Sequence, residues 1–315
     1  MLTVTDLNQV RDTLHYPVVS IGAFDGIHKG HQAIIQFLVE RARDKQGTSI
    51  VMTFNPHPQR LISPATAPPL LQTPEQKERI LAQMNVDVLV RFPFSRELSL
   101  LSPEQFLNDI LFPWKVREIV VGRNFRFGHK RAGDFETLRR LSALRGIPVH
   151  GIEPVEFRRV RISSTRVRTL LKEGRMELAR RLLGRPFQLR GTVVRGAGNG
   201  AILGFPTANL EPHNELIPAV GVYGGRAHVG ELIKPCVINI GFRPTLYERP
   251  EGVPVVEAHL LDFSGDLYGT TLSIDFCLRL RGEKRFDSVE SLKKQIAKDI
   301  KVTRKYLERL QLRRP

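Results

Sequence analysis

Short apolar segments alternate with segments of helical periodicity from residue 18 to residue 153, and this alternation restricts the fold more than any other feature of the chain. Strands separated by helices form βαβ units, whose strands lie parallel in one sheet. We therefore predict an α/β fold with a parallel sheet in the N-terminal part. The predicted strands read VVSIGAF, TSIVMTF, VDVLVRF, REIVVG and IPVHGI.

Helices are predicted between these strands. HQAIIQFLVERA repeats its apolar residues at the spacing of one helix face. TPEQKERILAQM opens with Thr73 as the N-cap and Pro74 at the first helical position, and Gln76 can complete a capping box. SPEQFLNDIL repeats the pattern from Ser102. These start signals indicate helices that connect successive strands.

The sequence pattern changes near residue 186. RPFQLRGTVVRGAGNG begins a region that is rich in glycine, proline and short β-type runs. Such spacing is typical of a small antiparallel barrel or sandwich. A long amphipathic helix is predicted at roughly residues 287–311. We therefore predict two domains, residues 1–185 and residues 186–315.

The composition indicates a cytoplasmic protein with no membrane partner. The chain has 315 residues, of which 41% are apolar, and no apolar run reaches the length of about 18 residues that spans a membrane. Its N-terminus lacks the plan of a secretory signal. Cys236 and Cys277 lie in apolar runs without CxxC spacing, so we expect buried, reduced thiols.

The formal net charge of +16 favours anionic partners. One class that fits is a nucleic-acid-binding protein with an OB-like barrel, which would show aromatic platforms and steep salt dependence. Aromatic residues make up only 7% of the chain, and no basic block is interleaved with them. We therefore expect no nucleic-acid partner and look for a phosphorylated small molecule.

The stretch SIGAFDGIHKGHQAII joins the first long strand to a helix. Ligands of open α/β sheets bind beyond the carboxyl ends of the strands, and the free N–H groups of a helix start favour an anion. Gly22, Gly26 and Gly30 permit a close approach of the backbone. His28 and His31 lie about one turn apart, so both imidazoles can face the same phosphate. The residues alone also fit a pair of surface histidines.

Several motifs resemble those of one family, the bacterial bifunctional riboflavin kinase/FAD synthetases. GAFDGIHKGH resembles the GxFDGxHxGH signature of the adenylyltransferase half, and TFNPHP, VVGRNFRFGHKRAGD and ISSTRVR follow in that family's order. LGFPTANL, GVYGG, NIGFRPT and DLYG resemble the flavokinase half. The resemblance covers nearly the whole chain, and it implies a Rossmann-like HxGH nucleotidyltransferase domain followed by an antiparallel β-barrel flavokinase domain.

For the N-terminal domain, the resemblance implies transfer of AMP from ATP to FMN, which yields FAD and pyrophosphate. His28 and His31 would hold the ATP phosphates and stabilise the leaving pyrophosphate, and Arg168 would join them as a catalytic residue. The remaining implied ATP-binding residues are Gly22, Phe24, Ser164 and Thr165. The implied flavin-binding residues are Asn55, where the family more often has an acidic residue, together with His57 and Asn124.

For the C-terminal domain, the resemblance implies phosphorylation of riboflavin to FMN. Thr207 and Asn209 would hold Mg²⁺ with the ATP phosphates, and hydroxyl and amide oxygens are suitable ligands for this ion. Gly198 and Gly200 would belong to a flexible flap over ATP, where Asn199 and Ala201 replace the family's usual basic residues. FMN and FAD would be substrate and product, not prosthetic groups.

Glu257 matches the catalytic base of the flavokinase half. Strand alternation places Glu257 on one face with Val255, Leu261 and Phe263, and His259 shares that face as a rival base. Alternation alone does not separate the two candidates.

Another enzyme class also remains open at this stage. A single-activity adenylyltransferase for another phosphorylated acceptor would share the HxGH core without the β-rich second half, so GFPTAN and Glu257 argue against it. The sequence leaves open the oligomeric state, including a homo-oligomer, and whether FMN passes directly between the two sites.

Overall fold

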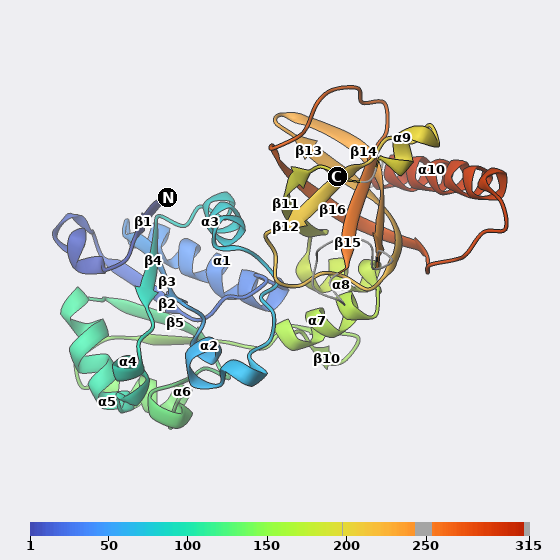
Figure 1. The fold of residues 1–315 in the computed structure, drawn as a ribbon. Coiled ribbons are helices and arrows are strands. Elements are labelled where there is room, and N and C mark those ends of the chain that lie inside the picture. The colour runs from blue at the N-terminus through green and yellow to red at the C-terminus, as the bar shows by residue number, and fades with distance from the viewer. Residues whose placement is uncertain (197, 243–253, 312–315) are drawn as a thin grey trace. The chain divides into compact units, whose positions relative to one another are not determined.

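The computed structural model describes residues 1–196, 198–242 and 254–311. The chain forms two compact units, shown in Figure 1. Unit 1 comprises Met1–Pro69 and Pro74–Ser163, and unit 2 comprises Leu70–Thr73 and Ser164–Pro315. The two helices after Ser163 therefore group with unit 2. The functional boundary at residues 185/186 stays a prediction.

Unit 1 contains the expected parallel sheet, with the strand order β1-β4-β3-β2-β5-β8. All five predicted strands form. The edge strand β1 was not predicted, because three residues are too short for a pattern of alternation. The strands are β1 Leu2–Val4, β2 Pro17–Ile21, β3 Thr48–Asn55, β4 Val88–Pro93, β5 Glu118–Gly122 and β8 Val149–Ile152.

Helices bury both faces of this sheet. Successive strand residues enter different apolar clusters, as Val18 and Val19 show. Ile35 and Leu81 cover one face, and Leu138 packs on the other. Burial on both faces explains why these strands read as continuous apolar runs. The α-helices of unit 1 are α1 Lys29–Asp44, α2 Pro58–Ile62, α3 Pro74–Gln83, α4 Arg96–Leu100, α5 Pro103–Gln105 and α6 Phe135–Ala143. A π-helix, Phe106–Leu111, directly follows α5.

The sheet reverses its direction of growth beside β2. From β2 the chain adds β3 and β4 on one side, and it then adds β5 and β8 on the other side. In open α/β sheets this reversal creates a crevice at the carboxyl ends of the two strands, which is where ligands bind. The SIGAFDGIHKGH stretch leaves β2 at this point.

Unit 2 contains a closed barrel with the strand order β11-β12-β15-β14-β13-β16, so the predicted antiparallel barrel is confirmed. The predicted C-terminal helix is α10, which packs against β13, β14 and β16. The elements are α7 Ser164–Lys172, α8 Met176–Leu183, β11 Phe187–Val194, α9 Asn199–Ile202, β12 Ala208–Pro212, β13 Gly221–Val229, β14 Leu232–Gly241, β15 Val255–Leu260, β16 Thr271–Arg281 and α10 Val289–Gln311.

The structure confirms two further sequence features. Cys236 and Cys277 are buried and form no disulfide. No helix in the described part of the chain is both long and apolar enough to cross a lipid bilayer.

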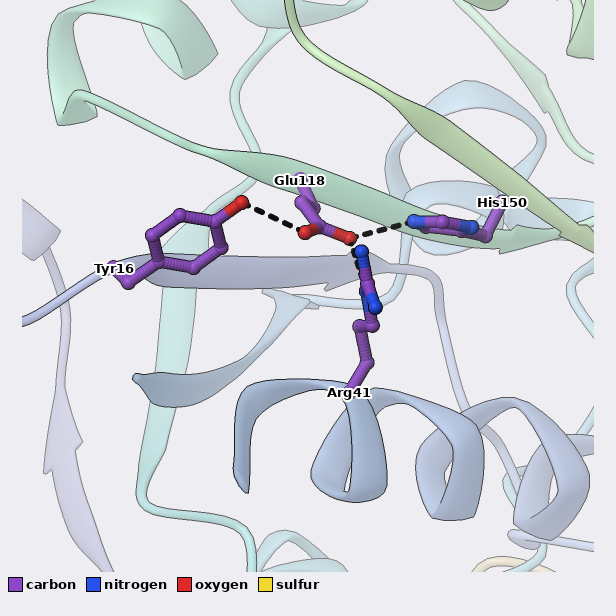
Figure 2. Close-up of polar contacts among 4 residues, drawn as sticks. All are labelled: Tyr16, Arg41, Glu118 and His150. Carbon is purple, nitrogen blue, oxygen red and sulfur yellow. Dashed lines mark hydrogen bonds and ion pairs between the residues drawn. The ribbon is translucent and has the colours of Figure 1, made fainter. Parts of the chain in front are cut away.

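A buried carboxylate joins four segments of unit 1, as Figure 2 shows. Glu118, at the start of β5, has a side chain that is 1% exposed. It accepts hydrogen bonds from the Tyr16 hydroxyl at 2.8 Å, Arg41 Nε at 2.7 Å and His150 Nε2 at 2.6 Å. Burial alone would raise the pKa of Glu118, but the three hydrogen bonds outweigh it and lower this pKa to about 2.

We predict that this cluster makes the stability of unit 1 fall in acid. Because the folded pKa of Glu118 lies below its ordinary value of 4.5, its contribution is complete above pH 4.5 and is lost as the pH falls towards 2. The shift corresponds to roughly 3 kcal/mol of unfolding free energy. Urea unfolding at pH 7 and pH 3 measures it through Trp114, the single tryptophan of the chain, which is buried in unit 1.

Glu118→Gln should make unit 1 less stable at pH 7 and should reduce the stability difference between the two pH values. The matched control is Glu136→Gln, because Glu136 is exposed and pairs only with its helix neighbour Arg139 among the described residues. An unchanged pH dependence in Glu118→Gln would contradict the assignment.

Candidate active sites

The predicted residues of unit 1 gather at one edge of the sheet. The segment from Gly22 to His31 follows β2, Asn55 ends β3, and Asn124 follows β5. Strands β3, β2 and β5 are neighbours and run parallel, so their carboxyl ends lie side by side. The fold therefore brings these residues to the crevice beside β2, as the sequence analysis expects.

The turn after β2 has unusual backbone angles. Phe24, Gly26 and Ile27 have positive φ values of 46°, 82° and 36°. Positive φ costs little for glycine, but it is unfavourable for a phenylalanine and rare for a β-branched isoleucine. The buried side chains of Phe24 and Ile27, 3% and 0% exposed, offset this cost by apolar packing. Strained backbone of this kind is concentrated at ligand-binding sites.

His28 caps the helix that follows this turn. Its Nδ1 accepts the backbone N–H of His31 at 3.3 Å, so a neutral His28 ring carries its hydrogen on Nε2. The two imidazole rings stack with their centroids 3.7 Å apart, and the Phe24 ring meets the His31 ring edge-on at 5.3 Å. His28 is only 5% exposed. The pair is thus part of a packed turn, not two independent surface histidines.

His31 has an unsatisfied ring nitrogen. Its Nδ1 is buried and has no hydrogen-bond partner among the residues that the structure describes. Burial, the neighbouring His28 and the Lys77 ammonium group lower the pKa of His31 well below its usual value. Buried polar atoms in folded proteins are nearly always paired. This nitrogen is therefore a candidate contact for an anionic ligand.

Two glycines of the motif provide room for rings. A Cβ at Gly22 would lie 3.1 Å from the Phe24 ring, and a Cβ at Gly30 would lie 3.2 Å from the His28 ring. Neither glycine has a positive φ, so each is needed for space, whereas Gly26 is needed for its conformation. This difference explains why three glycines occur within one short motif.

A lysine that the sequence analysis does not single out also reaches this turn. Lys77, on α3, donates from Nζ to the Ala23 carbonyl at 2.8 Å and to Thr53 Oγ1 at 3.1 Å. Thr53 Oγ1 in turn donates to the Ala23 carbonyl at 3.1 Å. No local pattern reveals this contact, because Lys77 follows Ala23 by 54 positions and looks like a solvent-facing residue of an amphipathic helix.

The predicted flavin residues differ in their surroundings. Asn55 is exposed at the end of β3, and His57 caps α2 by accepting the backbone N–H of Gln59 at 3.3 Å. A Cβ at Gly122 would lie 2.9 Å from Oδ1 of Asn124, so Asn124 folds back over the end of β5. The positions suit a ligand at the crevice, and the flavin contacts stay a prediction.

Ser164, Thr165 and Arg168 occupy the start of α7 in unit 2. Arg168 is 8% exposed, and Ser164 lies one helical turn before it. Helix α7 therefore places these three residues close to one another. Their contribution to the site at His28 and His31 stays a prediction.

In the barrel, three polar residues form a row across adjacent strands. Glu257 on β15 lies directly opposite Asn209 on β12 and directly opposite Asn239 on β14. Opposite residues of antiparallel strands project to the same face. The structure thus adds Asn239, a residue of the NIG sequence, to the predicted pair. Asn239 belongs to the NIGFRPT motif, which resembles the flavokinase half without marking this residue.

The glycine-rich segment before β12 packs closely on the predicted ATP residues. Gly196 lies against the side-chain amide of Asn209, and a Cβ at Gly200 would lie 3.0 Å from Thr207 Oγ1. Gly198 has a φ of 74° and open space around it. The short helix α9 begins at Asn199, where the sequence predicts a flexible flap.

Glu257 and His259 differ in their surroundings. His259 Nδ1 lies 2.8 Å from the carbonyl oxygen of Pro206, and its ring meets the Phe205 ring edge-on at 5.6 Å. Strand β15 ends at Leu260, so the predicted alternation does not continue to Leu261 and Phe263. His259 therefore supports the segment that leads into Thr207, while Glu257 faces the amide side chains.

The barrel residues suit a hard cation that is shared with a ligand. Among the residues that the structure describes, no group of three or more His, Cys, Asp or Glu side chains could hold a metal ion. Thr207 and Asn209 offer a hydroxyl and an amide oxygen at the start of β12, and Asn209 lies directly opposite Glu257. Mg²⁺ is commonly bound by few protein oxygens together with phosphates and water, so this donor set fits it.

Comparisons with known proteins match both halves of the chain. The FAD synthetase family model matches residues 11–166, and the riboflavin kinase family model matches residues 183–307. The chain is 38% identical to a bifunctional riboflavin kinase/FMN adenylyltransferase of Pseudomonas fluorescens, covering 96% of this chain and 97% of the relative. A Bacillus subtilis enzyme of the same description is 35% identical over 93% of each chain.

A solved structure shares the fold along nearly the whole chain. It is described as a macrolide-efflux protein from Streptococcus pneumoniae, with a TM-score of 0.83 and 30% identity, and the match covers 96% of this chain and 98% of that one. Both the sequence relatives and this structure therefore span both units.

We predict that His31 remains neutral throughout the range in which an ordinary histidine titrates. Desolvation, the neighbouring His28 and the Lys77 ammonium group disfavour its protonated form, so its pKa should lie well below 6.5. NMR titration of the histidine ring resonances measures this value, and His31→Gln assigns the signal. The interpretation fails if the signal that His31→Gln removes titrates near the ordinary value of 6.5.

Proposed function

The chain belongs to the family of bifunctional riboflavin kinase/FMN adenylyltransferases, and we propose that its adenylyltransferase site is the turn after β2 and its kinase site the row around Glu257. The enzyme phosphorylates riboflavin to FMN and adenylylates FMN to FAD. The riboflavin kinase match over residues 183–307 excludes the single-activity adenylyltransferase that the sequence left open.

For FAD formation, the reversal of the sheet at β2 carries the assignment. A phosphate oxygen of FMN would attack the α-phosphorus of ATP, and the bond to the bridging oxygen would break as pyrophosphate leaves. Reactions of this type depend on positioning and on charge stabilisation. The Nε2–H of His28, the ring of His31 and the free N–H groups at the start of α1 would bind the phosphates.

The remaining predicted residues would complete this site. Gly22 and Phe24 would line the ATP side, and the Phe24 ring already packs on His31. Ser164 and Thr165 would donate hydroxyl hydrogen bonds to the phosphates, and Arg168 would add a permanent positive charge for the departing pyrophosphate. Asn55, His57 and Asn124 would contact the flavin from the ends of β3 and β5.

For FMN formation, the register of the barrel supports Glu257 as the base. Its carboxylate would accept the proton of the 5′-hydroxyl of riboflavin while that oxygen attacks the γ-phosphorus of ATP and ADP leaves. Thr207 and Asn209 would hold Mg²⁺, which supplies charge neutralisation on the phosphates. Gly198 and Gly200 would belong to the segment that covers the ATP phosphates. We favour Glu257 over His259, because Glu257 lies directly opposite Asn209 and Asn239 in the barrel register.

We further propose a cytoplasmic location, which the two free thiols support. The proposed ligands are ATP, riboflavin and FMN, with Mg²⁺ bound together with ATP. The exclusion of nucleic acid as a partner and the oligomeric state stay predictions.

We predict that replacing His28 abolishes FAD formation but not FMN formation. His28→Ala removes both the imidazole and the helix cap, so the informative variant is His28→Asn, which keeps a capping side chain. Both variants should lower the rate of FMN adenylylation by roughly 100-fold or more. Chromatography of the products made from riboflavin and ATP–Mg²⁺ measures both steps. Full adenylylation by His28→Asn would mean that His28 serves only as a cap.

We also predict the opposite selectivity for Glu257. Glu257→Gln preserves the side-chain shape and removes the base, so riboflavin phosphorylation should fall by roughly 100-fold or more while adenylylation of supplied FMN continues. His259→Gln is the matched control on the same strand face and should lower the kinase rate much less. If His259→Gln has the larger effect, the roles of the two residues are reversed.

A further inference from the structure

Lys77 connects the two strand ends that carry the proposed adenylyltransferase residues. Its Nζ donates to the carbonyl of Ala23, which lies directly before the strained turn, and to Oγ1 of Thr53, which lies two residues before Asn55. Thr53 also donates to Ala23, so the three groups form a closed hydrogen-bonded triangle. The ammonium group thereby joins the turn after β2 to the end of β3.

This position is unusual for a lysine. The Lys77 side chain is half-buried, and its partner Thr53 is 2% exposed. Burial lowers the pKa of Lys77 to about 8, although the Asp25 carboxylate opposes the shift. Burying a charged amine is expensive unless the charge is used. A neutral side chain could fill the same space, so packing alone does not account for an ammonium group here.

The lysine also acts on His31. Its charge contributes to the lowered pKa of His31, together with burial and His28. The ionisable groups whose charges act on the Lys77 and His31 pair are Asp25 and His28, both on the turn that follows β2. A triphosphate bound at this turn would place its negative charge next to an ammonium group that is already held in position, with no side chain left to order.

We propose that Lys77 is a positioning residue for FMN adenylylation. It holds the phosphate-binding turn against the flavin-side end of β3, and it supplies a fixed positive charge beside that turn. This proposal rests on the proposed function of that turn. A lysine with this role must be protonated, and it must keep both hydrogen bonds. Its loss would therefore affect FAD formation and leave riboflavin phosphorylation in the barrel unchanged.

The test compares Lys77→Met, Lys77→Arg and Arg79→Met. Arg79 is exposed on the same helix and serves as the matched control. Lys77→Met should lower kcat/KM for FMN adenylylation by about 10- to 100-fold, with an increased KM for both ATP and FMN. Lys77→Arg should recover part of the loss. Riboflavin phosphorylation should stay within about twofold of the unmodified enzyme in all three variants.

A pH profile separates positioning by the charge from a purely structural role. In the unmodified enzyme, kcat/KM for adenylylation should fall above pH 8, as Lys77 loses its proton. Lys77→Arg should move this decline to higher pH, because guanidinium stays protonated. In Lys77→Met, the His31 pKa measured by NMR should rise, because one cationic neighbour has been removed.

Several outcomes would overturn the proposal. These are an effect of Lys77→Met no larger than that of Arg79→Met, an equal loss of both reactions, or a profile without a decline that Lys77→Arg can shift. The pH profile of the unmodified enzyme and Lys77→Arg remain informative if Lys77→Met fails to fold. If His28→Asn adenylylates FMN at the normal rate, both the assignment of the adenylyltransferase site and the proposed role of Lys77 fail. If Lys77→Met adenylylates FMN normally and His28→Asn does not, only the proposed role of Lys77 fails.

Discussion

The parallel pairing of β3, β2 and β5 is the constraint on which the proposed adenylyltransferase chemistry depends. It places three strand ends side by side at the point where the sheet reverses its growth. The turn carrying His28, the end of β3 and Asn124 thereby reach the same edge of the sheet. A buried carboxylate, Glu118, ties the opposite end of β5 to Tyr16 before β2, to Arg41 on α1 and to His150 on β8.

The turn after β2 contains several energetically unfavourable features within a few residues. Phe24 and Ile27 have unfavourable backbone angles, the imidazoles of His28 and His31 are stacked, and an ammonium group lies nearby. Burial, the neighbouring His28 and the Lys77 ammonium group all oppose a positive charge on His31. A bound triphosphate would reverse that balance, because its negative charge stabilises every cation around it. The free turn is therefore organised for an anion that it does not itself contain, and this organisation is what electrostatic catalysis requires.

The sequence predicts local features well and distant contacts poorly. Apolar runs and helix start signals depend on neighbouring residues, and the five strands, the capping box at Ser102 and the histidine pair were accordingly found. Lys77 reaches Ala23 across 54 positions, and Asn239 meets Glu257 only through barrel register. Glu118 likewise looks like the polar first residue of a strand. Its role emerges only when Tyr16, Arg41 and His150 arrive from three other segments.

Glycine serves the same physical purpose in both proposed sites. Gly30 makes room for the His28 ring, Gly122 for the amide of Asn124, and Gly200 for the hydroxyl of Thr207, and each stands where a Cβ would come within 3.2 Å of that side chain. None of the three has a positive φ. Their role is therefore to let a functional side chain lie flat against the backbone, which restricts its motion before any substrate binds. Alanine at Gly30 or Gly122 would displace that side chain, and at Gly200 its Cβ would also lie 2.6 Å from the carbonyl oxygen of Phe205. Space is therefore the property that makes these glycines necessary.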